Sequence, residues 1–231
     1  MRGAFSIHEA KPAVDEATGA APKLPRRREG NMTIRMHSRL DQSRVNGPGS
    51  RAVFWLQGCS LKCSGCWNPL SHSVEGGMTV EISSVVEWVA DLHASRSIDG
   101  LTISGGEPME QAGALLAFLQ ALRLRVPEIS VGMFSGYTER ELVIGAFLSR
   151  DANPPSHQAN LWRAIRLHLD FAVLGRFNGH RPSKQPLVSS QNQALLLFSD
   201  RHSSSDFSPL SVEFTIDSQG ITQITGFPIL Q

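Results

Sequence analysis

From Val45 onward, short apolar segments of strand length alternate with longer segments whose apolar residues recur at helical spacing. The expected strands are Arg51–Gln57, Leu101–Ile103, Ile129–Phe134 and Phe171–Leu174. The expected helices lie around 85–92, over 112–122, from Thr138 onward and over 161–169. Such alternation requires a mainly parallel sheet with right-handed crossovers, because each helix has to pack its apolar stripe back onto the sheet. The pattern therefore predicts an α/β fold, either an open doubly wound sheet or a part-closed barrel.

The two ends of the chain differ from this central pattern. Residues 1–40 are rich in Ala, Pro, Lys and Arg without a sustained apolar period, which predicts a disordered N-terminal extension. Residues 176–194 carry Gly and Pro in a polar stretch and are expected to be irregular. Near the C-terminus, 212–216 and 221–225 alternate around Asp217-Ser218-Gln219-Gly220, which predicts a β-hairpin. One catalytic domain over 41–231 follows from this organisation.

All three cysteines of the chain, Cys59, Cys63 and Cys66, fall in the loop that follows the first predicted strand. An odd number of closely spaced thiols is unsuited to a disulfide framework and indicates a metal site in a reducing compartment. Thiolates are the preferred ligands of iron–sulfur clusters, and three of them bind three irons of a cubane. The fourth iron is then open to a substrate or cofactor, as at a catalytic zinc. A Cys₃His zinc site completed by His72 is the alternative, since zinc accepts the same ligands.

Composition and charge restrict the cellular location and the classes of binding partner that we expect. The formal net charge is +1 with both signs interspersed, which argues against nucleic-acid binding driven by bulk charge. No apolar run approaches the length of about 20 residues that spans a bilayer, and the first thirty residues lack the apolar stretch of a secretory signal. We therefore expect a cytoplasmic protein without membrane contact.

A second signal lies about forty residues after the cysteines, where the next strand ends in Ser104-Gly105-Gly106-Glu107-Pro108. Glycines at the carboxyl end of a strand let the backbone approach a ligand closely, and that edge of a parallel sheet is where ligands bind. A Gly-Gly pair alone is more often a plain turn. Its position at the same sheet edge as the cysteine loop favours a binding role.

Three segments together resemble the activating enzymes of glycyl radical enzymes, and within that group the activators of anaerobic ribonucleoside-triphosphate reductases. They are the stretch 46–51 (NGPGSR), the stretch 57–69 (QGCSLKCSGCWNP) and the stretch 104–108 (SGGEP). A glycine before the third cysteine and an aromatic after it, here Gly65 and Trp67, are typical of that subgroup. Supporting matches are Ser135-Gly136-Tyr137, Asp170 before the fourth strand, and the final hairpin.

The resemblance implies a radical S-adenosylmethionine (SAM) enzyme with a partial (β/α) barrel of about five to six parallel strands. It implies a [4Fe–4S] cluster on the three cysteines, reductive cleavage of SAM, and installation of a glycyl radical on a large partner enzyme. An electron donor of the flavodoxin or ferredoxin type is implied as well. The residues then expected to bind the cofactor are Trp67, Asn68, Ser104, Gly105, Gly106, Glu107, Pro108, Ser135, Gly136, Tyr137 and Asp170.

Each of these assignments has a plainer alternative. Trp67 and Tyr137 could be core aromatics, and Asp170 could cap a strand end. Two other functions remain open on the sequence: a radical enzyme that acts on a small molecule or short peptide, and a zinc or iron–sulfur module without enzymatic activity.

Overall fold

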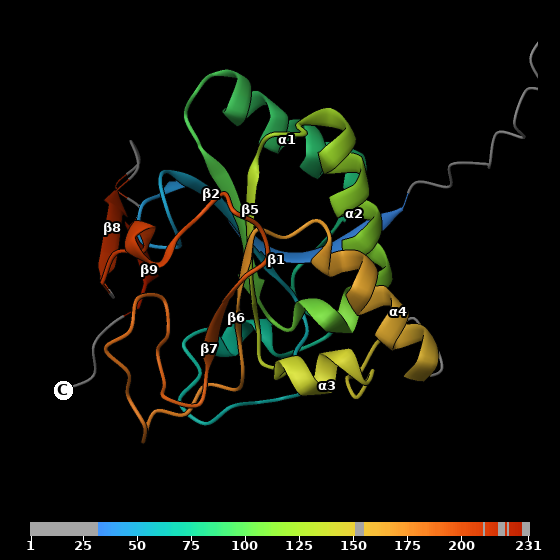
Figure 1. Ribbon diagram of the computed structural model, residues 1–231. Helices are drawn as coiled ribbons and strands as arrows, with labels where there is room; N and C mark the ends of the chain where they lie inside the picture. Colours follow the sequence, from blue (N-terminus) through green and yellow to red (C-terminus); the bar gives the residue numbers. More distant parts are fainter. Residues whose placement is uncertain (1–31, 151–154, 210, 217–219, 221, 228–231) are drawn as a thin grey trace, which may run out of the picture. The chain divides into compact units, whose positions relative to one another are not determined.

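The computed structural model describes residues 32–150, 155–209, 211–216, 220 and 222–227, which belong to one compact unit that begins at Asn31. Figure 1 shows the order of its elements along the chain. The strands are β1 (Thr33–Ser43), β2 (Arg51–Leu56), β3 (Met78–Glu81), β4 (Gly100–Gly105), β5 (Ser130–Ser135), β6 (Phe171–Leu174), β7 (Ala194–Leu197), β8 (Val212–Ile216) and β9 (Thr222–Gly226). The α-helices are α1 (Ile82–Ala94), α2 (Ala112–Arg125), α3 (Glu139–Val143) and α4 (Pro155–Arg166), and 3₁₀ turns cover Pro69–Ser71, Pro108–Gln111 and Ser204–Asp206.

Seven strands form one sheet in the order β3-β1-β2-β4-β5-β6-β7. The four central strands β2, β4, β5 and β6 are parallel, whereas β1, β3 and β7 pair antiparallel with their neighbours. The α/β class is thus confirmed, but the expectation of five to six parallel strands is wrong for the described residues. β3 and β7 are the edges of this sheet, so the partial barrel stays a prediction.

Helices α1, α2 and α4 cover one face of the sheet, with α2 between the other two (Figure 1). The crossover helices between successive parallel strands place their apolar stripes against the sheet, and the side chains of these stripes form much of the main core. At its centre Phe118 of α2 meets Phe54 of β2 edge to face, with ring centroids 5.3 Å apart. The predicted capping box at Thr138 and Glu141 is present and opens α3.

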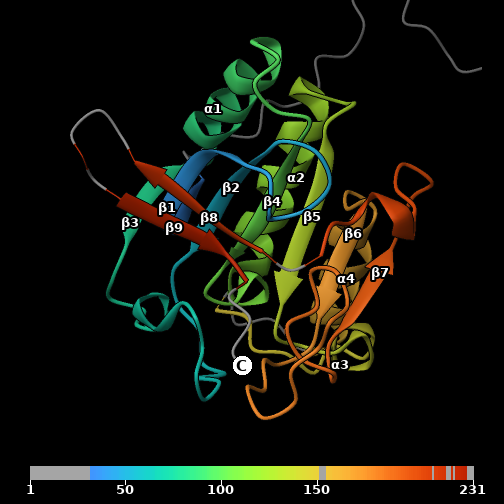
Figure 2. The ribbon, with the colours of Figure 1, turned by 90° about the vertical axis from the view of Figure 1, so that its left-hand side faces the viewer.

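The opposite face carries a second, smaller core and the C-terminal hairpin. Phe171 and Val173 of β6 pack there with Leu187, Val188, Phe207 and Phe227. The predicted hairpin is confirmed as β8 and β9, a two-stranded sheet of its own that lies across β1 and β2 in Figure 2. Between Leu174 and Ala194 the chain has no helix or strand, as its composition predicted, apart from a single bridge between Pro182 and Ser190.

The structure corrects the predicted N-terminal boundary. Residues 33–40, which composition placed in a disordered extension, form most of β1, while residues 1–31 lie outside the described part of the chain. β1 was missed because only Ile34 and Met36 are deeply buried apolar residues in an otherwise polar strand. Among the described residues no helix has the length and apolar character needed to cross a bilayer.

Candidate metal centre and adjoining pockets

The cysteine loop leaves the carboxyl end of β2 and is held to the protein by backbone hydrogen bonds. The N–H groups of Gly58 and Cys59 donate to the carbonyls of Ser71 and His72, at 2.8 and 3.0 Å. The loop takes left-handed backbone conformations at Lys62 (φ 45°) and Gly65 (φ 70°). All three thiols are free, half-buried and turned toward one pocket of about 140 Å³.

This pocket brings together the ends of the parallel strands, as the sheet-edge rule predicted. Of the expected cofactor-binding residues, eight line it beside the three cysteines: Trp67, Asn68, Ser104, Gly105, Gly106, Glu107, Ser135 and Gly136. The remaining lining comes from residues outside the expected cofactor-binding set: Leu61, Phe134, Val173, Gly175, Phe177, Ser189, Gln193 and Phe227. The cysteine loop and the Gly-Gly turn therefore share one site.

Gly105 and Gly106 are required by packing within the protein. Gly105 has φ 103°, and a Cβ there would collide with the backbone of Trp55 and Leu56 in β2. A Cβ on Gly106 would collide with the carbonyl of Gly58, at the base of the cysteine loop. The Glu107 N–H donates to that same carbonyl at 2.8 Å. The Gly-Gly turn thus packs directly against the cysteine loop, whereas the sequence predicted only that the two lie at the same sheet edge.

Glu107 joins the ends of β4 and β5. Its carboxylate is buried and accepts hydrogen bonds from the Ser135 hydroxyl (2.8 Å), the Gly136 N–H (2.8 Å) and the Met109 N–H (3.0 Å). Burial raises the pKa of Glu107 to about 7, although these donors oppose the shift. The side chain acts as a brace that sets the spacing of two pocket walls.

Three expected residues lie away from the pocket lining. Pro108 is buried at the start of a 3₁₀ turn, and the Tyr137 hydroxyl accepts a hydrogen bond from the Leu148 N–H at 2.9 Å. Asp170 precedes β6 and so lies at the opposite, amino-terminal edge of the sheet, where it accepts from the Val131 N–H at 2.8 Å and pairs with Arg123. For Asp170 the strand-cap alternative is the one that the geometry favours.

Glu110 is the most informative residue that the motifs missed. It is fully buried, and its carboxylate accepts a 2.5 Å hydrogen bond from the Ser60 N–H, next to Cys59. Its other oxygen forms an ion pair with Arg150, whose own N–H donates to the Glu110 carbonyl. Ser60 and Glu110 are fifty residues apart in sequence, so no local pattern could have indicated this clamp.

Aromatic rings form one wall beside the thiols. Trp67 lies 5.2 Å from Phe177 and 5.7 Å from Phe227 between ring centroids, and Phe227 also contacts Phe134 at 5.5 Å. Phe227 follows β9, so the C-terminal hairpin is joined directly to the residue after Cys66. Trp67 packs against the second core and also lines the pocket, so the geometry is compatible with either role.

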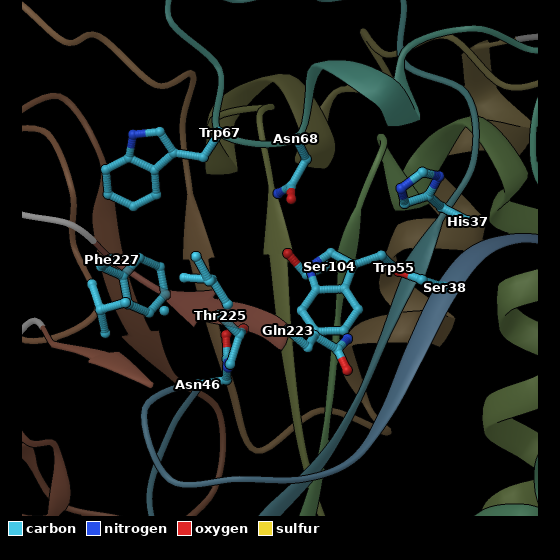
Figure 3. Close-up of a pocket in the computed structure, with 13 residues that line it drawn as sticks. His37, Ser38, Asn46, Trp55, Trp67, Asn68, Ser104, Gln223, Thr225 and Phe227 are labelled. Carbon is cyan, nitrogen blue, oxygen red and sulfur yellow. The ribbon is translucent and has the colours of Figure 1, made fainter. Parts of the chain in front are cut away.

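A second cavity of about 380 Å³ adjoins the first and shares Trp67, Asn68, Ser104 and Phe227 with it. Figure 3 shows Trp67 and Phe227 on one side of this cavity and His37 and Ser38 on the other. The hairpin supplies another wall, held by a 3.0 Å hydrogen bond from the Asn46 amide to the Thr225 hydroxyl. The combined space thus runs from the thiols to the gap between the sheet and the hairpin.

The donor set fits an iron–sulfur cluster. Burial raises the pKa of Cys59 to about 11 and that of Cys66 above its ordinary value, so thiolates here need a neighbouring positive charge, which iron supplies. Thiolates are the preferred ligands of iron–sulfur clusters, and a cubane accepts three of them at separate corners.

Comparison with known proteins agrees with this donor chemistry. Residues 45–196 match the family of 4Fe–4S single cluster domains, which covers both cysteine loop and Gly-Gly turn. The chain belongs to this family. The matched range ends in β7 and so takes in the whole parallel part of the sheet.

Several curated proteins similar to this chain are named anaerobic ribonucleoside-triphosphate reductase-activating protein. The protein of Vibrio cholerae is 32% identical over 127 residues, which cover 48% of this chain and 82% of the relative. That of Enterobacteria phage T4 is 28% identical over 157 residues, covering 65% and 86%. That of Escherichia coli is 30% identical over 101 residues, covering 42% and 66%. The resemblance seen in the motifs is confirmed.

Proposed function

We propose that this chain is a radical SAM activase, which holds a [4Fe–4S] cluster on Cys59, Cys63 and Cys66 and installs a glycyl radical on a partner enzyme. The observation that carries the proposal is the meeting of three free thiols with the strand-end residues of β4 and β5 in one pocket. The names of the relatives favour an anaerobic ribonucleoside-triphosphate reductase as the partner.

When bound, the cluster and SAM would together supply the one-electron chemistry that cleaves the sulfonium S–C5′ bond and removes a hydrogen atom from a glycine Cα. The protein contributes position and the exclusion of water. The backbone of Gly105 to Glu107 would face the amino end of SAM, and Ser135 and Gly136 would line its other side. Trp67 and Asn68 would separate this pocket from the second cavity.

The second cavity supports a macromolecular substrate. Its walls come from β1, β2 and the hairpin, so an extended loop of another protein can enter between sheet and hairpin and reach the shared residues Trp67, Asn68 and Ser104. Glycine suits such a loop because it has no side chain to hinder approach. The aromatic rings of Trp67, Phe177 and Phe227 would keep water from the reacting carbon.

The outer side of the cysteine loop suits delivery of the electron. Lys62 and Ser64 of the loop, and Leu70 just after it, are exposed. We propose that a small one-electron carrier of the flavodoxin or ferredoxin type docks at this surface. Reduced thiols of this kind also favour a cytoplasmic location.

Anaerobic reconstitution of the full chain with iron and sulfide tests the proposal. We expect about four irons per chain, absorbance near 400 nm, and release of 5′-deoxyadenosine from SAM under a strong reductant. Addition of the reductase should produce a glycyl radical signal in the electron paramagnetic resonance spectrum of that protein. Release of 5′-deoxyadenosine without a signal on the partner would indicate a different, smaller substrate and contradict the activase role.

The variant Cys63→Ala gives the sharpest control. Loss of one of three thiolate ligands should abolish stable cluster loading and all SAM cleavage, because the remaining two thiols leave two irons without protein ligands. The fold should persist, since Cys63 is half-buried in a loop and lies outside both cores. Iron content and the far-ultraviolet circular dichroism spectrum measure the two effects, and unchanged iron content would overturn the ligand assignment.

A further inference from the structure

A further depression, of about 670 Å³ and distinct from the two cavities beside the thiols, lies at the amino-terminal edge of the sheet. It is formed by the C-terminal ends of α2 and α4 and by the residues that follow β7. Its lining residues are Arg123, Pro127, Arg163, Arg166, Leu167, Leu169, Asp170, Phe198, Ser199 and Arg201. Four arginines and one aspartate give this surface a formal excess of three positive charges. The whole chain has a formal net charge of only +1, so positive charge is concentrated here.

Two of the four arginines take part in the structure itself. Arg123 donates to the carbonyls of Ile129 and His168 and pairs with Asp170 at 3.1 Å. Arg201 contacts the other oxygen of Asp170 at 3.3 Å. Burial alone would raise the pKa of Asp170, but hydrogen bonds from Ser199, the Val131 N–H and Arg123 hold it below its ordinary value. Asp170 is therefore ionised and fixes two guanidinium groups at the base of the depression.

The other two arginines, Arg163 and Arg166, lie one turn apart on α4 and have no carboxylate partner among the ion pairs of the described residues. Within the part of the chain that the structure describes, Arg163 donates to the Asn160 side chain at 3.1 Å, and Arg166 stacks over the Phe198 ring at 4.8 Å. Stacking holds a guanidinium in one plane while its N–H groups stay available. Like charges so close on one helix repel each other, which an anion in the depression would relieve.

We propose that this depression binds a polyphosphate, free or as the tail of a nucleotide. Guanidinium groups match phosphate oxygens in a two-point geometry, and several phosphates in a row can engage several arginines at once. A polyphosphate carries several negative charges in a row, whereas a single carboxylate carries one. The site is separate from the cluster pocket, with which it shares no lining residue, so it acts as a docking or regulatory site and not in the chemistry.

The full purified chain can be titrated with inorganic triphosphate, ATP, adenosine and hexaglutamate by isothermal calorimetry. Triphosphate and ATP should both bind, with affinity that falls as salt is raised, and adenosine should not. Binding of ATP but not of triphosphate would show that the base carries recognition, and would overturn the polyphosphate assignment. Hexaglutamate binding as tight as triphosphate would identify an acidic-protein surface and also overturn it.

The double variant Arg163→Gln/Arg166→Gln should weaken triphosphate binding by at least about tenfold per lost charge-assisted contact. Arg140→Gln, at an exposed position of α3, removes one positive charge outside the depression, as Arg163→Gln does within it, and should leave the affinity unchanged. Trp162 offers a second readout, because its buried ring meets Phe198 edge to face at 6.0 Å and its fluorescence should change on binding. Arg163→Gln alone, at an exposed position, keeps the test valid if Arg166 proves necessary for folding. Equal affinities of the double variant and Arg140→Gln would overturn the proposal.

Discussion

The carboxyl and amino edges of the central sheet differ in how their polar side chains are paired. At the carboxyl edge, backbone turns with glycines press together, and three thiols are left free on one pocket. At the amino edge, charged side chains are buried and mutually satisfied. Arg51 there is fully buried and donates five hydrogen bonds, to Pro48, Leu101, Thr102 and two atoms of Ser130. The amino edge therefore maintains the fold, whereas the carboxyl edge leaves its three thiols free to bind a ligand.

Arg51 should be the largest single contributor to stability at the amino edge. Burial lowers its pKa to about 9, and Asp170 and Asp99 partly offset that effect, so the charge is retained at neutral pH. Arg51→Met leaves several buried acceptors unpaired and should lower the free energy of unfolding by about 3–5 kcal/mol. Urea denaturation measures the loss.

The matched control is Arg125→Gln, which breaks an exposed ion pair with Glu87. Its free energy of unfolding should change by less than about 1 kcal/mol. If Arg51→Met and Arg125→Gln lower the free energy of unfolding equally, the buried amino edge contributes no more to stability than an exposed ion pair does.

Glu107 gives the carboxyl edge a pH dependence of its own. Its folded pKa of about 7 lies above the ordinary 4.5, so the folded protein binds more protons than the unfolded chain between these values. The contribution of Glu107 to the free energy of unfolding is therefore complete below pH 4.5 and decreases as the pH rises toward 7. It does not change further at higher pH. The loss amounts to about 3 kcal/mol.

Glu107→Gln should remove this dependence, because the amide does not titrate. The measurement is the free energy of unfolding of both proteins at several pH values from about 4.5 to about 8, and the difference between them carries the signal. A difference that does not vary with pH would contradict the raised pKa.

Gly106→Ala tests whether the Gly-Gly turn and the cysteine loop form one unit. The new Cβ would meet the Gly58 carbonyl, so the loop has to shift, at a cost of about 1–3 kcal/mol. Both cluster loading and SAM affinity should fall, as measured by iron content and equilibrium dialysis. Gly179→Ala is the control, since its Cβ would meet only the Phe177 ring at 3.6 Å, an ordinary contact. If Gly106→Ala weakens SAM affinity but leaves iron content normal, the Gly-Gly turn and the cysteine loop do not act as one unit.

Glu110→Gln tests the clamp on the cysteine loop with the smallest change of shape. The amide keeps one acceptor for the Ser60 N–H but presents N–H groups to Arg150, so the ion pair is lost. Loss of such an outer contact should weaken iron retention by about 10–100-fold, measured against a chelator. Glu87→Gln, at an exposed ion pair, should leave retention unchanged. Unchanged retention in Glu110→Gln would show that the loop needs no such support.

Local signals in the sequence were sufficient to predict the central strands of the fold and the edge of the sheet where the cysteine loop lies. The strands before the cysteine loop and the Gly-Gly turn, the capping box at Thr138 and the C-terminal hairpin all follow from short-range patterns. Asp170 was assigned to the cofactor on resemblance alone, although its place before β6 already put it at the amino edge of a parallel strand. β1 was missed because most of its residues are polar, and β3 because it has only four residues and is largely exposed. β7 is apolar but only four residues long, so its sequence does not distinguish a strand from a helix.

By itself the sequence determined that three thiols in one loop meet a glycine turn at the same sheet edge, since both depend on adjacent residues and on the rule of parallel strands. Only the tertiary structure decided which polar groups brace that edge. Glu110 reaches Ser60 across fifty residues, and Phe227 reaches Trp67 from the C-terminal hairpin. Such contacts arise from the packing of distant segments, and no local periodicity encodes them.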